Sequence, residues 1–158
     1  MADVDTQSGA GALAAAIQAS HQVAYVTRDS ERGREAAEAV LGVGAFDVLD
    51  LALDVVDESG VKLAETRITA SFALDRSFEI IEPVDDPYDL FGVSGSDGQA
   101  PLEFHHVGAI VGDLEPSLQA ARERSLSVVR LQVPGMEAAF IDLRPIGGHR
   151  LELLCLGS

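Results

Sequence analysis

Cysteine is nearly missing from this chain, whose 158 residues include a single one, Cys155. One thiol excludes an intrachain disulfide and a zinc or iron–sulfur site built from thiolates. A chain without disulfides is typical of a reducing compartment, so we expect a cytoplasmic protein in which Cys155 packs as a small apolar side chain.

Positive charge is also scarce, because the chain has 11 Lys and Arg residues against 26 Asp and Glu. The formal net charge of -15 and the pI near 4.4 would repel nucleic acid and anionic membrane surfaces, and no basic stripe offsets that repulsion. A small ligand or a protein partner fits this charge better. We therefore expect a small-molecule substrate, with no nucleic acid and no membrane as partner.

Long apolar runs are missing as well. The stretch Ala10–Ile17 is too short for a membrane span, and Asp3 and Asp5 precede it where an export signal would carry basic residues. We expect residues 1–20 to form a flexible arm or one weak helix. Hydrophobic residues make up 47% of the chain, which is enough for one compact core.

An internal duplication is the main pattern that is present. The segment His21–Glu31 recurs as His105–Glu115, with His, Val, Asp and Glu at matching places. Each copy then runs on to a short apolar strand that holds one carboxylate, at Phe78–Ile81 and at Leu151–Leu154. Desolvating a carboxylate is costly unless it is ion-paired, hydrogen-bonded or metal-bound. The repetition of this cost in both copies predicts a cation shared between two half-sites.

Each copy has the pattern of a β-α-β-β-β unit. In the first copy a β-branched strand begins at Gln22, and the helix after it starts at Asp29 or Ser30 and ends near Gly42. Asp57–Gly60 has the composition of a hairpin turn. We expect an α+β fold in which two tandem βαβββ modules form a curled mixed sheet around a cleft. The expected boundaries are residues 21–84 for the first module, 85–103 for an acidic, Gly- and Ser-rich linker loop, and 104–158 for the second module.

Strand alternation indicates which polar residues face the cleft. Gln22 and His106 each lie seven residues before the helix-capping Asp of their copy, so they share an equivalent face. The neighbouring His21 and His105 would then point to the other face. With the two strand glutamates, the predicted ligand set is Gln22, Glu79, His106 and Glu152. One amide, one imidazole and two carboxylates suit a divalent ion with open coordination positions, such as Zn, Ni, Co, Mn or Mg.

These residues resemble the vicinal oxygen chelate superfamily, which includes glyoxalase I, methylmalonyl-CoA epimerase, extradiol dioxygenases and bleomycin resistance proteins. The resemblance runs from Gln22 to Leu156 and rests on the duplicated strand-Asp-helix opening and the paired aliphatic-Glu-aliphatic endings. Leu41–Phe46 looks like the glycine turn after the first helix of such proteins, and Phe104–Gly108 looks like the start of their second module. In that family the first and fourth strands of each module supply the metal ligands, which implies the same four residues here.

The pattern is most similar to the glyoxalase I and epimerase branch, which implies a metal-dependent isomerase, epimerase or lyase. Two neighbouring substrate oxygens would chelate the ion, which stabilises an enolate or enediolate, while a glutamate moves a proton at the adjacent carbon. Glu152 is implied as that base, with Glu79 acting on the opposite face. We also expect a homodimer, because such modules often pair between chains.

Two other functions stay open. A metal-free binding protein of the bleomycin-resistance type would use the cleft to hold an organic molecule. A ring-cleaving dioxygenase holds iron with two His and one carboxylate, so it would need His21, His105 or His149 to turn inward. The chain has one lysine, Lys62, and no basic cluster, so neither coenzyme A nor glutathione is implied as part of the substrate.

Several further side chains compete for a role. Glu82 is a rival of Glu79, although it falls outside the apolar run. A second group could bind an anionic substrate or line its cleft: Arg67, Arg76, Arg144, Tyr25 and Phe140. For each of these five, a surface ion pair or a place in the core is the simpler expectation.

Overall fold

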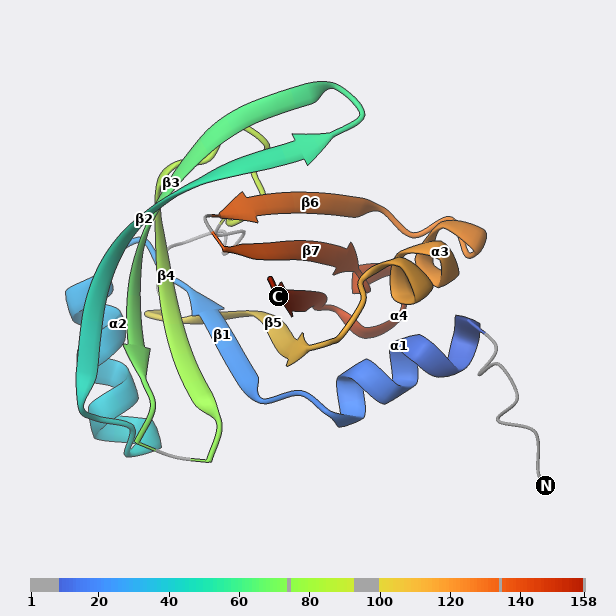
Figure 1. Ribbon diagram of the computed structural model, residues 1–158. Helices are drawn as coiled ribbons and strands as arrows, with labels where there is room; N and C mark the ends of the chain where they lie inside the picture. Colours follow the sequence, from blue (N-terminus) through green and yellow to red (C-terminus); the bar gives the residue numbers. More distant parts are fainter. Residues whose placement is uncertain (1–8, 74, 93–99, 134, 158) are drawn as a thin grey trace.

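The computed structural model describes residues 9–73, 75–92, 100–133 and 135–157, and its strands close into a barrel (Figure 1). The strand order around the barrel is β1-β4-β3-β2-β6-β7-β8-β5. The strands are β1 (Gln22–Val26), β2 (Phe46–Asp57), β3 (Gly60–Ser71), β4 (Ser77–Asp85), β5 (Glu103–Ile110), β6 (Val128–Val133), β7 (Met136–Asp142) and β8 (Arg150–Leu156). The helices are α1 (Gly9–Gln18), α2 (Ser30–Ala36) with the π-helical turn η1 (Ala37–Leu41), α3 (Glu115–Glu123) and α4 (Arg144–Gly147).

Both copies of the repeated segment build the same arrangement. In each copy the first strand runs parallel to the last, so that β1 lies beside β4 and β5 beside β8. A parallel pair requires a crossover connection, which includes α2 in one copy and α3 in the other. The two copies meet through the antiparallel pairs β1 with β5 and β2 with β6. The expected α+β fold with a curled mixed sheet is confirmed, and the sheet closes on itself.

The local sequence explains where α2 begins and ends. Asp29 has an extended backbone, and its carboxylate accepts a hydrogen bond from the Arg32 N–H at 3.1 Å. The Glu82 carboxylate accepts another from the Ser30 N–H at 2.8 Å. The helical segment ends after η1 at Gly42, whose φ of 69° lies in the left-handed region that favours glycine. The predicted start and end of this helix are confirmed.

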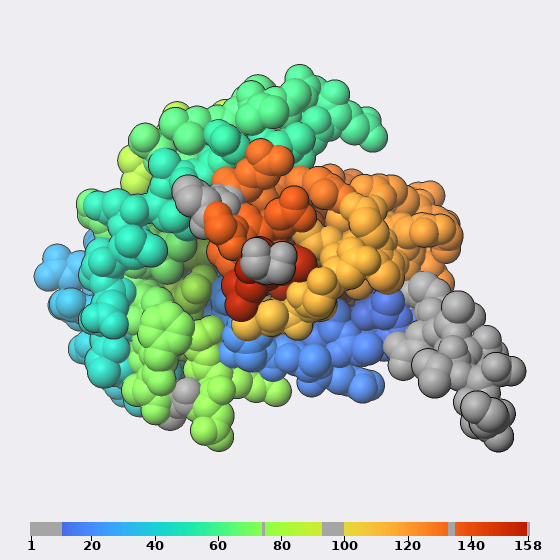
Figure 2. Space-filling view, viewed as in Figure 1, coloured from blue at the N-terminus to red at the C-terminus, as the bar shows by residue number. Residues whose placement is uncertain are grey.

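The strands β2 and β3 form a hairpin, and each is longer than the strands on either side of the hairpin. Both strands have 12 residues, and they are joined at the predicted turn Asp57–Gly60. The Ser59 N–H donates to the Asp57 carboxylate at 2.7 Å, which stabilises the turn. Asp54–Val56 pair with β6, and the tip of the hairpin arches past β6, as the space-filling view also shows (Figure 2).

Apolar side chains pack on both sides of the barrel wall. The interior cluster includes Val26, Val55, Ile81 and Phe140. A second cluster packs α1 and α3 against the outside of the second copy and includes Leu118, Ile141, Leu151 and Leu153. A smaller one, with Phe78 and Ile80, lies outside the first copy. The inner surface near Gln22 is the part of the barrel where polar side chains replace this packing.

Two segments outside the expected modules pack against the barrel, which the sequence did not predict. Residues 9–18 of the expected arm form α1, whose Leu13 and Ala16 are buried against the second copy. In the expected linker, Leu90 and Phe91 are buried in the barrel interior. Burial of these apolar side chains explains both differences, because it offsets the entropy lost on ordering a segment. Among the described residues, no helix has the length and apolar character needed to cross a membrane.

Candidate active site

Four polar side chains meet inside the barrel, and they are the four predicted ligands. The amide nitrogen of Gln22 lies 2.8 Å from Oε2 of Glu79 and 3.1 Å from Oε2 of Glu152. The same nitrogen lies 3.3 Å from Nε2 of His106, which itself lies 3.1 Å from Oε2 of Glu152. We refer to Gln22, Glu79, His106 and Glu152 as the quartet.

Strand pairing explains why the quartet forms. Its members come from β1, β4, β5 and β8, which are neighbours in the barrel. Gly108 on β5 pairs with Gln22 on one side and with Glu152 on the other. A Cβ placed on Gly108 would lie 3.1 Å from the Cβ of Gln22, so the missing side chain leaves the space through which Gln22 reaches Glu152.

The quartet is largely removed from solvent. His106 is 1% exposed and Gln22 is 4% exposed. Burial raises the pKa of Glu79 to about 8, and the nearby Glu152 carboxylate acts in the same direction. Glu79 therefore holds a proton at neutral pH when no other cation is present.

The quartet gathers several potential metal donors around one point. Two carboxylate oxygens and one imidazole nitrogen face the Gln22 amide, which has only two hydrogens to donate, and the contact between His106 and Glu152 needs a hydrogen of its own. A cation at the position of the Gln22 amide nitrogen would contact both carboxylate oxygens and the imidazole nitrogen. If the amide group were rotated so that its oxygen turned inward, that oxygen would be a fourth ligand. Oxygen and imidazole donors of this kind fit a divalent ion.

The spacing of these donors is that of hydrogen bonds. Metal–ligand distances to nitrogen and oxygen are about 2.0–2.2 Å for zinc, so the side chains would have to move inward by about 1 Å. In the part of the chain that is described, no group of three or more His, Cys, Asp or Glu side chains has the geometry of a preformed metal site. The donor types therefore fit a metal, whereas their spacing fits the metal-free state.

His105 also lies inside the barrel, which the strand alternation did not predict. β1 and β5 change register between Ala24 and Tyr25, where Ala24 pairs with His106 and Tyr25 with Phe104. His105 is the extra residue of this β-bulge, so it turns inward beside His106 instead of pointing to the other face. It is 2% exposed, and the expectation that it shares the outer face with His21 is wrong.

Both ring nitrogens of His105 are engaged. Nε2 lies 2.7 Å from the carbonyl oxygen of Leu90, and Nδ1 lies 2.8 Å from Nδ1 of His106. Burial, together with the nearby His106, lowers the pKa of His105 to about 3. His105 is thus a neutral side chain that contacts a member of the quartet and has no nitrogen left for a metal. The adjacent pair His105-His106 is the only sequence signal that could have indicated it.

Most of the other candidates lie away from the quartet, and Phe140 contacts it. Glu82 points to the outer face of β4, where it caps α2, and the half-buried His149 lies against the Phe104 ring. Tyr25 stacks on Phe78 outside the barrel, whereas the Phe140 ring lies 4.9 Å from the His106 ring, centroid to centroid. The three arginines contact their neighbours: Arg67 with Asp50, Arg76 with Ser20, and Arg144 with Asp142.

A cavity of about 460 Å³ gives access to the quartet. Gln22 and Glu79 lie in its wall, together with His21, Phe72, Asp75, Ser77, Ile110 and Leu154. Its size is that of small-molecule sites in proteins. The cavity therefore has a polar inner end at Gln22 and Glu79 and several apolar side chains along its wall.

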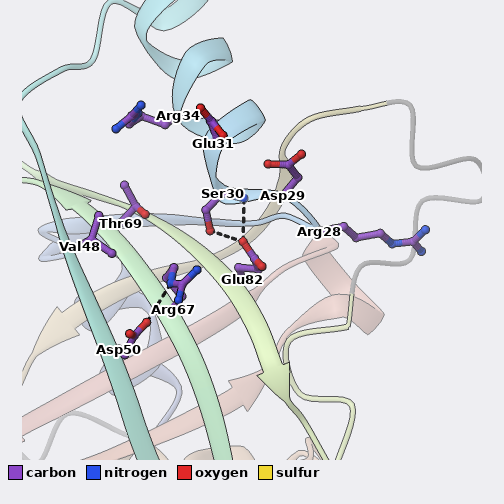
Figure 3. A pocket seen from close by; sticks show the side chains of 10 residues that line it. All are labelled: Arg28, Asp29, Ser30, Glu31, Arg34, Val48, Asp50, Arg67, Thr69 and Glu82. Carbon is purple, nitrogen blue, oxygen red and sulfur yellow. Dashed lines mark hydrogen bonds and ion pairs between the residues drawn. The ribbon is translucent and has the colours of Figure 1, made fainter.

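A larger depression, of about 690 Å³, lies outside the barrel between α2 and the outer face of β2, β3 and β4 (Figure 3). Its charged groups bind one another or cap the helix, because Arg67 pairs with Asp50 and Glu82 binds Ser30. Glu82 and Glu79 are three residues apart on one strand, so they point to opposite faces. The depression is therefore separate from the quartet.

The arrangement of two βαβββ units is the one implied by the resemblance to the vicinal oxygen chelate superfamily, and comparison with solved structures confirms this fold. Methylmalonyl-CoA epimerase from Mycobacterium tuberculosis superposes with a TM-score of 0.53 at 13% identity, covering 89% of this chain and 89% of that chain. The Streptomyces coelicolor epimerase in complex with 2-nitronate-propionyl-CoA gives 0.52 at 13% identity, covering 88% and 97%. A hypothetical protein from Bacillus halodurans gives 0.51 at 12% identity, covering 88% and 94%.

At these identities the likeness establishes the fold. No protein-family model matches the chain, and no curated protein sequence matches it. The fold that the sequence resemblance implied is thus confirmed, and the activity has to be argued from the site.

Proposed function

We propose that this protein moves a proton at a carbon atom next to a carbonyl group, as an epimerase or isomerase of the vicinal oxygen chelate type, with a divalent cation held by the quartet. The observation that carries the proposal is the meeting of three acceptor atoms around the Gln22 amide at the end of a cavity. A cluster of two carboxylates, an imidazole and an amide that a small molecule can reach is suited to a cation and its ligand.

The four side chains would hold the cation through carboxylate, imidazole and amide donors. When bound, a divalent cation acts as a Lewis acid that stabilises negative charge on two neighbouring substrate oxygens. The cavity wall from Phe72 and Ile110 would exclude water from one side of the substrate. Because the quartet is buried, its electrostatic interactions with a charged substrate are strong.

The two glutamates would divide the proton transfer between them. Glu152 removes the proton from one face of the carbon, and Glu79 returns one to the other face. Burial raises the pKa of Glu79 to about 8 in the metal-free site, which favours a carboxyl group that can take up and release a proton near neutral pH. Glu152 lies on β8 and Glu79 on β4, so the two groups approach the substrate from different sides.

The substrate class follows from this chemistry. It is a small acyl compound with one C–H bond acidified by a carbonyl group and a second oxygen placed to chelate with the first. Methylmalonyl-CoA, which is bound in the structure of a similar epimerase, has this chemistry and is the first compound to test. The acidic charge of this chain and its single lysine, Lys62, favour a substrate that relies little on a basic surface.

A metal-free binding protein is the second candidate. It is favoured by the apolar side chains of Phe72, Ile110 and Leu154 in the cavity wall, which suit an organic molecule. A two-His iron dioxygenase is disfavoured, because the second inward histidine, His105, uses one nitrogen on Leu90 and the other on His106.

Metal binding separates the proposals. We expect calorimetric titration with Zn²⁺ or Co²⁺ to show one site in the wild type, and its loss in Glu152→Ala and His106→Ala. Glu82→Gln is a matched control, because Glu82 lies on the same strand as Glu79 but faces outward. Equal metal binding in all variants, or none in the wild type, would refute the metal-dependent function and leave the binding protein.

A further inference from the structure

His105 is a buried group that the proposed reaction does not use. It sits between the Phe91 and Phe140 rings, with centroid distances of 5.5 Å and 5.7 Å. A histidine in such an apolar setting is costly unless both ring nitrogens are satisfied. Its two nitrogens contact the Leu90 carbonyl and the His106 ring, and these two contacts determine where the hydrogens lie.

The first contact places a hydrogen on Nε2 of His105. A carbonyl oxygen can only accept, so the 2.7 Å contact with Leu90 requires an N–H donor at Nε2. Leu90 is itself buried in the barrel interior. The direction of this bond is therefore set by the backbone.

The second contact then places a hydrogen on Nδ1 of His106. A neutral His105 with its hydrogen on Nε2 has a lone pair on Nδ1, so His106 must donate across the 2.8 Å contact. A cationic His105 would be buried with no carboxylate in the hydrogen bonds that the structure shows for it, and Arg144 and Arg150 also disfavour its charge. The neutral form is therefore the stable one.

The other nitrogen of His106 faces the quartet. Nε2 lies 3.1 Å from Oε2 of Glu152 and 3.3 Å from the Gln22 amide nitrogen, whose two hydrogens are donated to Glu79 and Glu152. The contact between Nε2 and Glu152 holds a hydrogen that a cation would displace, whereas the hydrogen on Nδ1 is fixed by His105.

We propose that His105 is a positioning residue that keeps a hydrogen on Nδ1 of His106, so that Nε2 is the nitrogen that faces Glu152 and the centre of the quartet. The relay runs from the Leu90 carbonyl through His105 to His106. The β-bulge is what makes it possible, because it brings two consecutive histidines to one side of the sheet. The value of this tautomer for metal binding rests on the proposed function, whereas the tautomer itself does not.

The tautomer can be measured without any metal. Long-range ¹⁵N–¹H NMR of the metal-free wild type distinguishes the two nitrogens of each histidine ring. We expect the hydrogen of His106 on Nδ1 and that of His105 on Nε2. A wild-type spectrum that shows no hydrogen on Nδ1 of His106 would overturn the inference, and this measurement needs no variant to fold.

Two substitutions test the relay by function. His105→Phe keeps a ring between Phe91 and Phe140 but removes the acceptor, and we expect about 10- to 100-fold weaker Zn²⁺ binding, the usual effect of losing an outer-shell partner. His105→Asn offers an oxygen near the position of Nδ1, so it should restore most of the lost affinity. His149→Phe is the control, because His149 is half-buried and its ring contact with Phe104 lies outside the quartet.

The outcomes separate the two proposals. If the wild type binds no Zn²⁺ but His106 shows the expected tautomer, the relay stands and the metal-dependent function fails. If His105→Phe binds Zn²⁺ as tightly as wild type with an unchanged His106 tautomer, the relay is refuted while the metal site stands.

Discussion

The two copies of the repeated unit share one plan but contribute different chemistry to the centre of the barrel. The first copy supplies a neutral amide, Gln22, and a glutamate whose pKa is raised, Glu79. The second supplies an imidazole, His106, with a buried partner behind it, and a second glutamate. The bulge that provides this partner is found in β5, and β1 has five residues paired without an extra one. The second copy thus supplies the candidate ligand, His106, that has a further buried side chain holding it in place.

A second difference concerns the space around the two half-sites. The position that is Gly108 in the second copy is Ala24 in the first, and Ala24 is fully buried. The glycine leaves room for Gln22, whereas the alanine fills the barrel interior. The two copies therefore differ both in their candidate ligands and in the packing next to those ligands. A substitution in one copy should thus have a different effect from a substitution in the other.

The largest effect is expected from the glutamates. Glu152→Gln should lower epimerisation of methylmalonyl-CoA by about 10²- to 10⁴-fold, the typical contribution of a general base. Glu79→Gln should stop interconversion of the two stereoisomers but leave deuterium exchange from solvent into one of them. NMR of the substrate in D₂O measures both. Loss of exchange from both stereoisomers in Glu79→Gln would contradict a division of roles between the copies.

The pH dependence of stability should come next in size. The pKa of Glu79 is raised to about 8 in the folded protein from 4.5, so the folded state binds a proton that the unfolded state releases. The free energy of unfolding of the metal-free protein should therefore be highest below pH 4.5, fall as pH rises toward 8, and level off above that. Between these limits the slope should approach about 1.4 kcal/mol per pH unit.

Urea unfolding from pH 5 to pH 9 measures this effect. Glu79→Gln should flatten the curve, because a neutral amide has no proton to lose. The same proton competes with a metal, so Zn²⁺ affinity in the wild type should rise with pH through the same window. An equally steep fall in stability in Glu79→Gln would show that another group is responsible.

The glycine difference should give an intermediate effect. Gly108→Ala places a methyl group against Gln22, and overpacking of this kind costs about 1–3 kcal/mol. We expect weaker Zn²⁺ binding as well, since Gln22 is displaced. The reciprocal change Ala24→Gly should lower stability by about 1 kcal/mol through a lost methyl group, with Zn²⁺ binding retained. Chemical unfolding and calorimetry measure both, and an equal loss of metal binding in the two variants would contradict the asymmetry.

The smallest effect is expected at the outward-facing glutamate. Glu82→Ala removes the acceptor for the Ser30 N–H at the start of α2, which should cost about 1 kcal/mol of stability. Metal binding and activity should not change, because Glu82 lies on the other face of β4 from Glu79. A loss of metal affinity beyond about twofold would mean that the outer face is coupled to the site.

Much of the fold could be predicted because local signals and the duplication agree. Asp29 begins a helix, Asp57–Gly60 turns a hairpin, and the repeat places the remaining strands. The quartet followed from strand alternation and from the cost of burying Glu79 and Glu152. These inferences need only near neighbours in the sequence and one physical rule each.

The parts that could not be predicted depend on partners far away in the chain. The bulge at His105 arises from how β5 pairs with β1, and the two consecutive histidines are its only sign within β5. The segment that carries Leu90 is rich in acidic residues, Gly and Ser, yet Leu90 and Phe91 fill the interior of a barrel built by other strands. Closure of the barrel is likewise a property of all eight strands together.

The carbonyl of Leu90 belongs to the connection between the two copies, and this has a consequence for evolution of the protein. A backbone group cannot be altered by a point mutation, so the contact with His105 can change only through the path of the connection itself. Insertions or deletions between Asp85 and Leu90 would shift that atom and disturb His106 from a distance. In descendants of this chain, that stretch should conserve its length while its side chains drift.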